Sequence, residues 1–189
     1  MTRKPASSTV ANTIAAASII LVPDAGPLIT LAYADALDLL LKPGWRVQIV
    51  DMVLYELNRN ATPTSEKIRR WVEQSSIAIL NTQTYQRYQA LQNRGDAKPR
   101  KANLGEIAMQ ETMTGLALSA PEIQGVIFLF EDHKIARASF LLPDNCRKVS
   151  TRAWLLFLEG KGWIASAADI ERAAIANGRS FSLLRFPPE

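Results

Sequence analysis

Four short apolar runs recur along the chain, and segments with helical periodicity separate them. The runs lie at residues 19–22, 47–50, 77–80 and 126–130. A strand that is apolar throughout is typical of a parallel sheet covered by helices on both faces. Residues 147–149 predict a short fifth strand. The alternation of strands and helices therefore predicts an α/β fold with a central, mostly parallel sheet of about five strands.

The helices are predicted from apolar residues that recur with a period near 3.6. We expect helices over residues 28–41, 52–58, 104–118, 135–141, 152–158 and 167–176, one that begins around 62–64, and a polar one that contains Tyr85, Tyr88 and Leu91. Residues 92–101 read as a basic loop.

The chain divides into three parts by composition and pattern. Residues 1–17 predict a flexible N-terminal tail, although Arg3 and Lys4 before an Ala-rich stretch leave a weak signal peptide as an alternative. Residues 18–150 form the predicted α/β domain. Residues 151–189 predict a C-terminal helical extension that packs on the same domain.

Composition sets broad limits on what the chain can do. Its 189 residues suit one domain with a sizeable core. Lys and Arg number 22 against 18 Asp and Glu, and this mild excess permits a polyanionic partner without requiring one. A single cysteine, Cys146, excludes an internal disulfide and fits a reducing cytoplasm. We therefore expect a cytoplasmic protein with no membrane segment.

Acidic residues follow several of the predicted strands. Asp24 comes directly after the first strand, Glu131 and Asp132 follow the fourth, Glu56 lies in the helix after the second, and Glu106 begins a long helix. Ligands of open parallel sheets bind at the carboxyl ends of the strands. Carboxylates that meet there repel one another unless a cation lies between them, and Mg²⁺ or Mn²⁺ suits such oxygen ligands. The pattern predicts metal-assisted attack of water on a phosphodiester.

Each acid also has a structural explanation when it is taken alone. Asp24 and Asp132 can each begin a helix, where carboxylates are favoured. Glu106 follows Asn103 by three residues, which resembles a capping box. Glu56 can be an exposed helical residue. Helix capping does not require all of these residues to fall on one edge of a sheet, so their joint placement favours a functional site.

Four segments together resemble the PIN-domain family of metal-dependent nucleases, which includes VapC-type toxins. The segments are "VPDAGPLITLAYADALDLLL", "VQIVDMVLYELNRN", "NLGEIAMQE" and "GVIFLFEDHKIARASF", and "VSTRAWLLFLEGKGWI" is similar to a tail in one branch of the family. The resemblance covers about residues 18–165 in the family's order, and ordered motifs are more specific than any single one. It implies a three-layer α/β/α fold.

The resemblance also implies which acids carry the chemistry. The acidic quartet would be Asp24, Glu56, Glu106 and Asp132, with Asp24, Glu106 and Asp132 as ligands of Mg²⁺ or Mn²⁺. Glu56 would orient water or hold a second ion. Asp132 is assigned rather than Glu131 because the family's acid usually stands second after the strand.

This chain departs from the commonest pattern just after the first acid. Ala25 and Gly26 stand where the family often has Ser or Thr. We expect Thr30 or Ser150 to supply the missing hydroxyl, since the partners of a metal's ligands shape its site.

Basic residues flank the predicted site along the sequence. Arg137 and the group Lys98, Arg100 and Lys101 are the candidates for RNA binding, through salt-dependent contacts with phosphates. A structural salt bridge and a solvated loop are the respective alternatives. His133 is the only histidine, so a zinc site of His and Cys is excluded.

By resemblance, the chain is a metal-dependent endoribonuclease that leaves a 5′-phosphate. The family also implies the toxin of a type II toxin-antitoxin pair, with an antitoxin protein as partner, and a homodimer. The alternative is a catalytically degenerate PIN scaffold that binds RNA or a protein without turnover.

Overall fold

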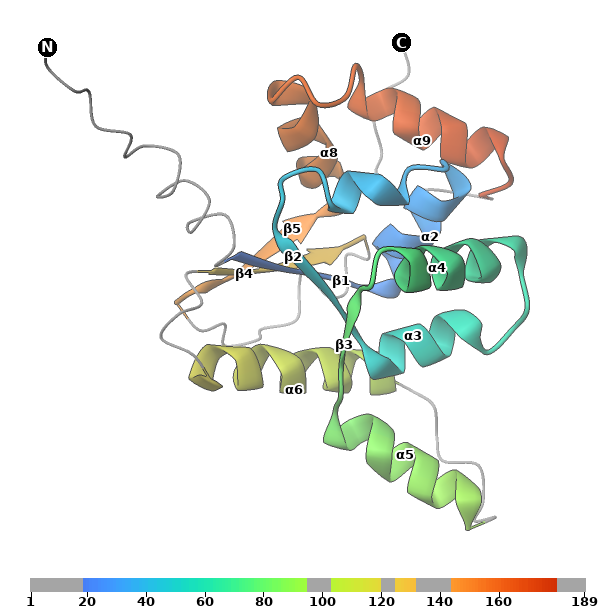
Figure 1. The fold of residues 1–189 in the computed structure, drawn as a ribbon, viewed down its shortest axis with the longest axis vertical. Helices are drawn as coiled ribbons and strands as arrows, with labels where there is room; N and C mark the ends of the chain where they lie inside the picture. The colour runs from blue at the N-terminus through green and yellow to red at the C-terminus, as the bar shows by residue number, and fades with distance from the viewer. Residues whose placement is uncertain (1–18, 95–102, 120–124, 132–143, 180–189) are drawn as a thin grey trace, which may run out of the picture.

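The computed structural model describes residues 19–94, 103–119, 125–131 and 144–179. These residues form a five-stranded sheet with the order β3-β2-β1-β4-β5 (Figure 1). The strands are β1 (Ile19–Pro23), β2 (Arg46–Val50), β3 (Ala78–Leu80), β4 (Gly125–Phe130) and β5 (Cys146–Ser150). Every neighbouring pair is parallel, which confirms the predicted sheet.

Helices cover both faces of this sheet in three layers (Figure 1). The helices α2, α4, α8 and α9 lie on one side, α6 lies on the other, and α5 packs against α6 and extends away from the sheet. Their bounds are α2 (Ala25–Tyr33), α3 (Asp51–Asn58), α4 (Pro63–Gln74), α5 (Gln83–Asn93), α6 (Leu104–Ser119), α8 (Thr151–Gly160) and α9 (Ala167–Ala176). The three-layer α/β/α architecture expected from the resemblance is confirmed.

The order of the strands reverses at β1, which lies between β2 and β4. Pro23 of β1 is paired with Leu129 of β4, and the Asp24 N–H donates to the Leu129 carbonyl over 2.8 Å. The carboxyl ends of β1 and β4 therefore lie side by side at the point where α/β sheets usually bind ligands.

The core forms where the sheet meets its helices. Leu21, Ile49 and Phe128 from the strands, Leu28 from α2 and Trp154 from α8 are at most 2 % exposed. Burying each such side chain stabilises the fold by roughly 1.5–3 kcal/mol. Because α8 contacts β4 and β5 and α9 contacts α2, the C-terminal helices complete the layer on that face. None of the described helices combines the length and hydropathy that a membrane span needs.

The prediction of one continuous helix over residues 28–41 was wrong. The helix α2 ends at Tyr33, Asp35 has a φ of 52°, and Leu37–Leu40 forms a short 3₁₀ turn. This left-handed residue redirects the chain so that Leu37 and Leu40 are buried. An uninterrupted period of 3.6 cannot reveal such a break, because the same leucines suit both arrangements.

Two further predictions concern the segments on either side of α6. Gln92 and Asn93, predicted in the basic loop, belong to α5. The helix predicted over 135–141 lies outside the described residues.

Candidate active site

Asp24 lies between β1 and α2, at the N-cap position of the helix. Its backbone is extended, with φ −79° and ψ 175°, and within the described chain its side chain makes no capping hydrogen bond to α2. Asn or Asp residues that serve as helix caps normally accept such a bond from the first turn. Capping therefore does not account for the carboxylate at this position.

Glu56 projects from α3 toward the first turn of α6. A Cβ atom placed on Gly105 would lie 2.9 Å from its Oε2 and 3.2 Å from its Oε1. A Cβ at this position would therefore force the flexible Glu56 carboxylate to shift, and the glycine in the Leu104-Gly105-Glu106 sequence lets that carboxylate reach the backbone of α6. The close approach gives this glycine a physical role beside the acid that follows it.

The pKa of Glu56 is raised by burial and by the acidic residues near it. The residue is exposed overall, yet partial burial of its carboxylate raises the pKa, and the negative charge of Asp24 raises it further. A hydrogen bond from Gly105 and the charge of Arg59 lower the pKa, while Glu106 adds a smaller upward contribution. Three acids from separate elements thus act on one another electrostatically.

Asp24 and Glu106 also share a small hollow at the end of β4. Its remaining walls are apolar and consist of Met109, Met113, Phe128, Leu129 and Phe130. Both acids therefore lie at the carboxyl end of β4.

The structure therefore brings three of the four predicted acids to one edge of the sheet. Asp24, Glu56 and Glu106 lie there, whereas Asp132 is outside the described residues. In the described ranges, no three Asp, Glu, His or Cys side chains are close enough together to hold a metal as they stand.

Glu131 is occupied by other contacts. It is 5 % exposed, its Oε2 accepts a hydrogen bond from Thr30 Oγ1 over 2.6 Å, and its Oε1 accepts one from Arg179 Nη2 over 3.2 Å. A Cβ on Gly26 would lie 2.9 Å from the Glu131 Cβ, so the glycine admits this side chain against α2. Glu131 thus ties the end of β4 to α2 and to Arg179.

The two hydroxyls expected near the acids have other partners. Thr30 donates to Glu131, and Ser150 Oγ accepts from the Ala153 N–H as the cap of α8. Thr30 is therefore connected to the acidic residue beside Asp132, and Ser150 serves the C-terminal helix.

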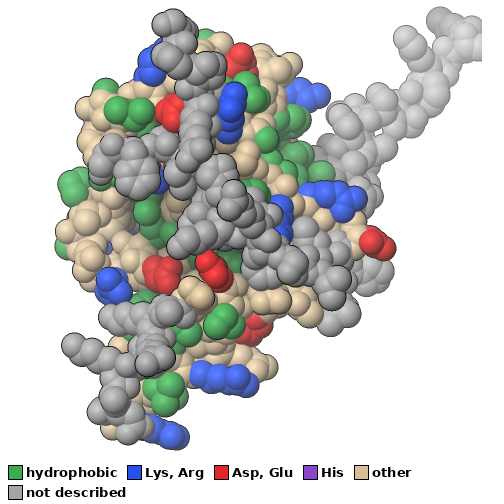
Figure 2. Space-filling model, turned by 180° about the vertical axis from the view of Figure 1, so that it is seen from behind, with side chains coloured by type: hydrophobic (Ala, Val, Ile, Leu, Met, Phe, Trp, Pro, Cys, Tyr) green, Lys and Arg blue, Asp and Glu red, His purple; other side chains and the backbone are tan. Residues whose placement is uncertain are grey.

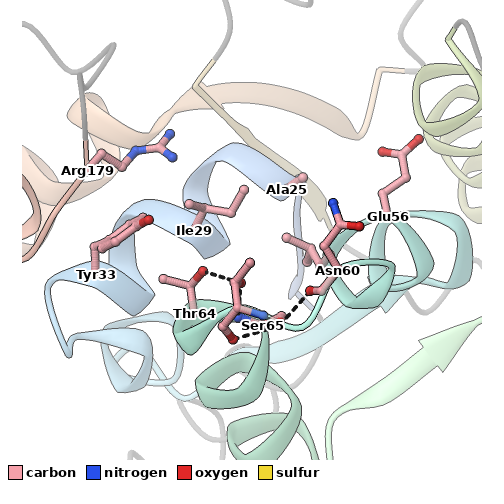
Figure 3. A pocket seen from close by; sticks show the side chains of 10 residues that line it. Ala25, Ile29, Tyr33, Glu56, Asn60, Thr64, Ser65 and Arg179 are labelled. Carbon is pink, nitrogen blue, oxygen red and sulfur yellow. Dashed lines mark hydrogen bonds between the residues drawn. The ribbon is translucent and has the colours of Figure 1, made fainter.

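Sequence reasoning missed a pocket that adjoins Glu56. It has a volume of about 380 Å³ and lies between α2, α3 and α4 (Figure 3). The lining residues are Ala25, Ile29, Tyr33, Glu56, Leu57, Asn60, Thr62, Thr64, Ser65 and Arg179. Arg179 lies far from the others in sequence and follows α9, so no local motif pointed to it.

The predicted RNA-binding residues Lys98, Arg100, Lys101 and Arg137 all lie outside the described residues. The Lys and Arg side chains that are described are spread over the face in Figure 2, where acidic side chains lie among them. On this face the described basic residues thus mark no single path for RNA.

Residues 20–99 match the family model DUF3368, a PIN domain. Over these residues the chain is similar to the PIN-domain family. The matched range includes Asp24 and Glu56, and it ends before Glu106 and Asp132. No curated protein and no solved structure matches the chain.

Similarity to the PIN family indicates the coarse function. PIN domains are generally nucleases, so a nuclease-type hydrolase is the activity to which this fold belongs. They typically use divalent metals, and the carboxylate oxygens of Asp24, Glu56 and Glu106 are donors of the kind that Mg²⁺ and Mn²⁺ accept. Mg²⁺ is usually held by only one or two carboxylates and keeps several waters. A site for it therefore does not require a closed cage of protein ligands.

Proposed function

We propose that this PIN domain is an endoribonuclease that depends on Mg²⁺ or Mn²⁺ and hydrolyses RNA phosphodiester bonds. One observation carries the proposal: Asp24, Glu56 and Glu106 lie at one edge of the sheet, where burial and then the negative charge of Asp24 raise the pKa of Glu56. Repulsion of this kind is relieved when a cation lies between the acids.

In the proposed mechanism, Asp24, Glu106 and Asp132 would hold the ion, and the bound ion would supply Lewis-acid stabilisation of negative charge on the phosphate. Glu56 orients the attacking water and accepts its proton, a role that suits a carboxylate whose pKa is raised. Attack forms a new P–O bond and breaks the bond to the 3′ oxygen. The products carry a 5′-phosphate and a 3′-hydroxyl.

The RNA backbone is proposed to contact Lys98, Arg100, Lys101 and Arg137. Lys98, Arg100 and Lys101 precede Glu106 in the sequence, and Arg137 follows Asp132 closely. Contacts of this kind give an affinity that falls steeply as salt rises.

We further propose that the protein is a VapC-like toxin of a type II pair, held inactive by an antitoxin protein in the cytoplasm, and that it forms a homodimer. Leu156, Trp163 and Ile175 are large exposed apolar residues on or beside α8 and α9, and they offer surface for a protein partner. In this proposal residues 18–150 form the nuclease domain and residues 151–189 its helical extension.

One observation favours the alternative of a degenerate scaffold. Within the described residues no three potential ligands are placed to share a metal. A PIN scaffold of that kind would bind RNA or a protein without turnover.

The test is cleavage of a fluorescently labelled RNA by the purified protein, with Mg²⁺, with Mn²⁺ and with a chelator. We expect cleavage with either ion and loss of it to background when the ion is removed. Cleavage that persists at full rate under chelation would contradict the metal requirement. Binding of RNA without cleavage in any ion would favour the scaffold.

A further inference from the structure

The pocket between α2, α3 and α4 is large enough for a ligand and opens beside the acids. Its volume of about 380 Å³ lies in the ~300–1,000 Å³ range of pockets that hold small organic molecules. Glu56 lies at one end and Arg179 at the other (Figure 3). A ligand in this pocket therefore reaches from the proposed catalytic edge to a guanidinium group.

Apolar side chains form one wall of the pocket. Ala25 and Ile29 come from α2 and Leu57 from α3, and the ring of Tyr33 lies farther along α2 (Figure 3). Flat apolar and aromatic surfaces suit the face of a nucleobase, which proteins often hold by stacking.

The hydroxyls on the opposite wall are already bonded to one another. Thr62 Oγ1 accepts from the Ser65 N–H over 3.1 Å and lies 3.1 Å from Thr64 Oγ1, and Ser65 Oγ donates to the Asn60 and Thr62 carbonyls. These bonds fix the first turn of α4 as a rigid wall.

Two other polar groups on the pocket are not engaged in this way. Neither the side-chain amide of Asn60 nor the hydroxyl of Tyr33 bonds to any described residue, and Figure 3 shows the Asn60 amide rising from the loop after α3 into the pocket. An amide presents one acceptor and two donors, which match the edge of a base.

Arg179 provides positive charge at the far end. Its Nη2 donates to the buried Glu131, and 18 % of the Arg179 side chain remains accessible. A guanidinium held on one side by a carboxylate keeps further N–H donors with fixed orientation, which suits a phosphate.

These features fit one unit of a nucleic acid chain. We propose that the pocket binds a single nucleotide of the RNA substrate next to the cleaved bond, with its base beside Asn60 at the Glu56 end and its far phosphate near Tyr33 and Arg179 (Figure 3). The inference rests on the proposed function for the position of the cleaved bond. It makes Asn60 a residue that determines sequence preference.

Two asparagines provide the test, one that lines the pocket and one that does not. Asn60→Ala removes the amide that lines the pocket, and Asn58→Ala removes an exposed amide two residues earlier that does not line it. Each variant is measured for kcat/KM on short RNAs that differ in one base on either side of the cleaved bond. Binding of the same RNAs is measured by fluorescence anisotropy in the Asp24→Asn background.

We expect the wild-type protein to prefer particular bases at one position beside the cleaved bond. Asn60→Ala should lower kcat/KM about tenfold for the preferred base, equivalent to about 1.4 kcal/mol, and flatten the preference. Tyr33→Phe should weaken binding less, because the ring remains. Asn58→Ala should behave as wild type, and melting temperatures should agree among all variants.

The outcomes separate this inference from the proposed function. If wild type cleaves RNA and Asn60→Ala leaves rate, affinity and base preference unchanged, the nucleotide site is overturned and the nuclease stands. If wild type does not cleave but RNA binding depends on Asn60 and not on Asn58, the nucleotide site stands and the nuclease is overturned.

Discussion

Two carboxylates on or against α6 have opposite environments. Glu111, in the middle of the helix, accepts hydrogen bonds from the Gln83 N–H over 2.6 Å, the Thr84 N–H over 3.0 Å and the Thr84 hydroxyl over 2.8 Å. It thereby holds the N-terminus of α5. Glu56 lies against the first turn of α6 beside Asp24 and Glu106, so like charges surround it.

The pKa values of these two residues move in opposite directions. Burial alone would raise the pKa of Glu111, but the bonds from Gln83 and Thr84 outweigh burial and hold it below the ordinary value of 4.5. Burial and Asp24 raise the pKa of Glu56 above that value. The difference teaches that carboxylates satisfied by N–H donors hold elements together, whereas carboxylates crowded by other acids mark the edge where a cation can bind.

The largest expected effect is on activity, and it separates the carboxylates crowded by other acids from those satisfied by N–H donors. Asp24→Asn should lower the rate of RNA cleavage by at least about 100-fold, because the change removes a proposed metal ligand, while loss of a mere partner of a ligand already costs about 10–100-fold. Asn has nearly the same size and shape as Asp, and the bond from the residue 24 N–H to the Leu129 carbonyl is kept, so we expect little change in stability. Cleavage and thermal unfolding are measured on the same preparation.

An Asp24→Asn variant that cleaves at the wild-type rate would remove Asp24 from the site. A variant that unfolds would show that Asp24 is a structural carboxylate, and Asp24 would then no longer support the comparison with Glu111.

Asp51 is a carboxylate satisfied by N–H and O–H donors, and its replacement should give the next largest effect, which is on stability rather than on activity. Its Oδ1 accepts from the Met52 N–H and the Thr82 hydroxyl and its Oδ2 from the Thr82 N–H, each over 2.7 Å, and the residue is 7 % exposed. In Asp51→Asn an amide NH₂ group replaces one of the two accepting oxygens. A donor then faces a backbone N–H, and at least one buried hydrogen bond is lost. We expect the free energy of unfolding to fall by about 1–3 kcal/mol, measured by urea denaturation.

The rate per folded molecule should stay close to wild type in Asp51→Asn, because the hydrogen bonds of its carboxylate go to Met52 and Thr82 and to none of the three acids. A large loss of rate at full stability would show that this buried acid belongs to the active edge.

The sheet and its helices were predictable because apolar periodicity reflects burial, which dominates folding. All five strands, the two C-terminal helices and α6 follow from runs such as that of β4 and from the pattern Trp154, Leu155 and Leu158. The break at Asp35 did not follow, since backbone conformation at one residue decides it. The position of Asp24 was predictable because an acid that directly follows a strand of a parallel sheet lies at its carboxyl end, whereas Glu106 was proposed from the resemblance of its Leu-Gly-Glu segment.

Pairings between distant segments were not predictable from local pattern. Arg179 and Glu131 meet across 48 residues, and Glu111 reaches Thr84 across 27. Only three-dimensional packing creates such contacts. Gly26 and Gly105 carried a usable signal, because glycines beside predicted acids often mark close approach of another chain segment.

The smallest expected effect is a change in melting temperature, and its sign should differ between Glu56→Gln and Glu111→Gln. Both variants are measured without divalent ions. Because the folded pKa of Glu111 is lowered, its charge stabilises the protein above pH 4.5, and this stability is lost as pH falls through the lower folded pKa. Because the folded pKa of Glu56 is raised, its charge destabilises the protein as pH rises through that value. At pH 7, Glu111→Gln should therefore lower the melting temperature and Glu56→Gln should raise it, each by about 2 °C or less for groups open to solvent. Both differences should shrink toward zero well below pH 4. Shifts of the same sign at pH 7 would show that the two carboxylates do not differ as described, and the case for a strained acidic edge would lose its electrostatic support.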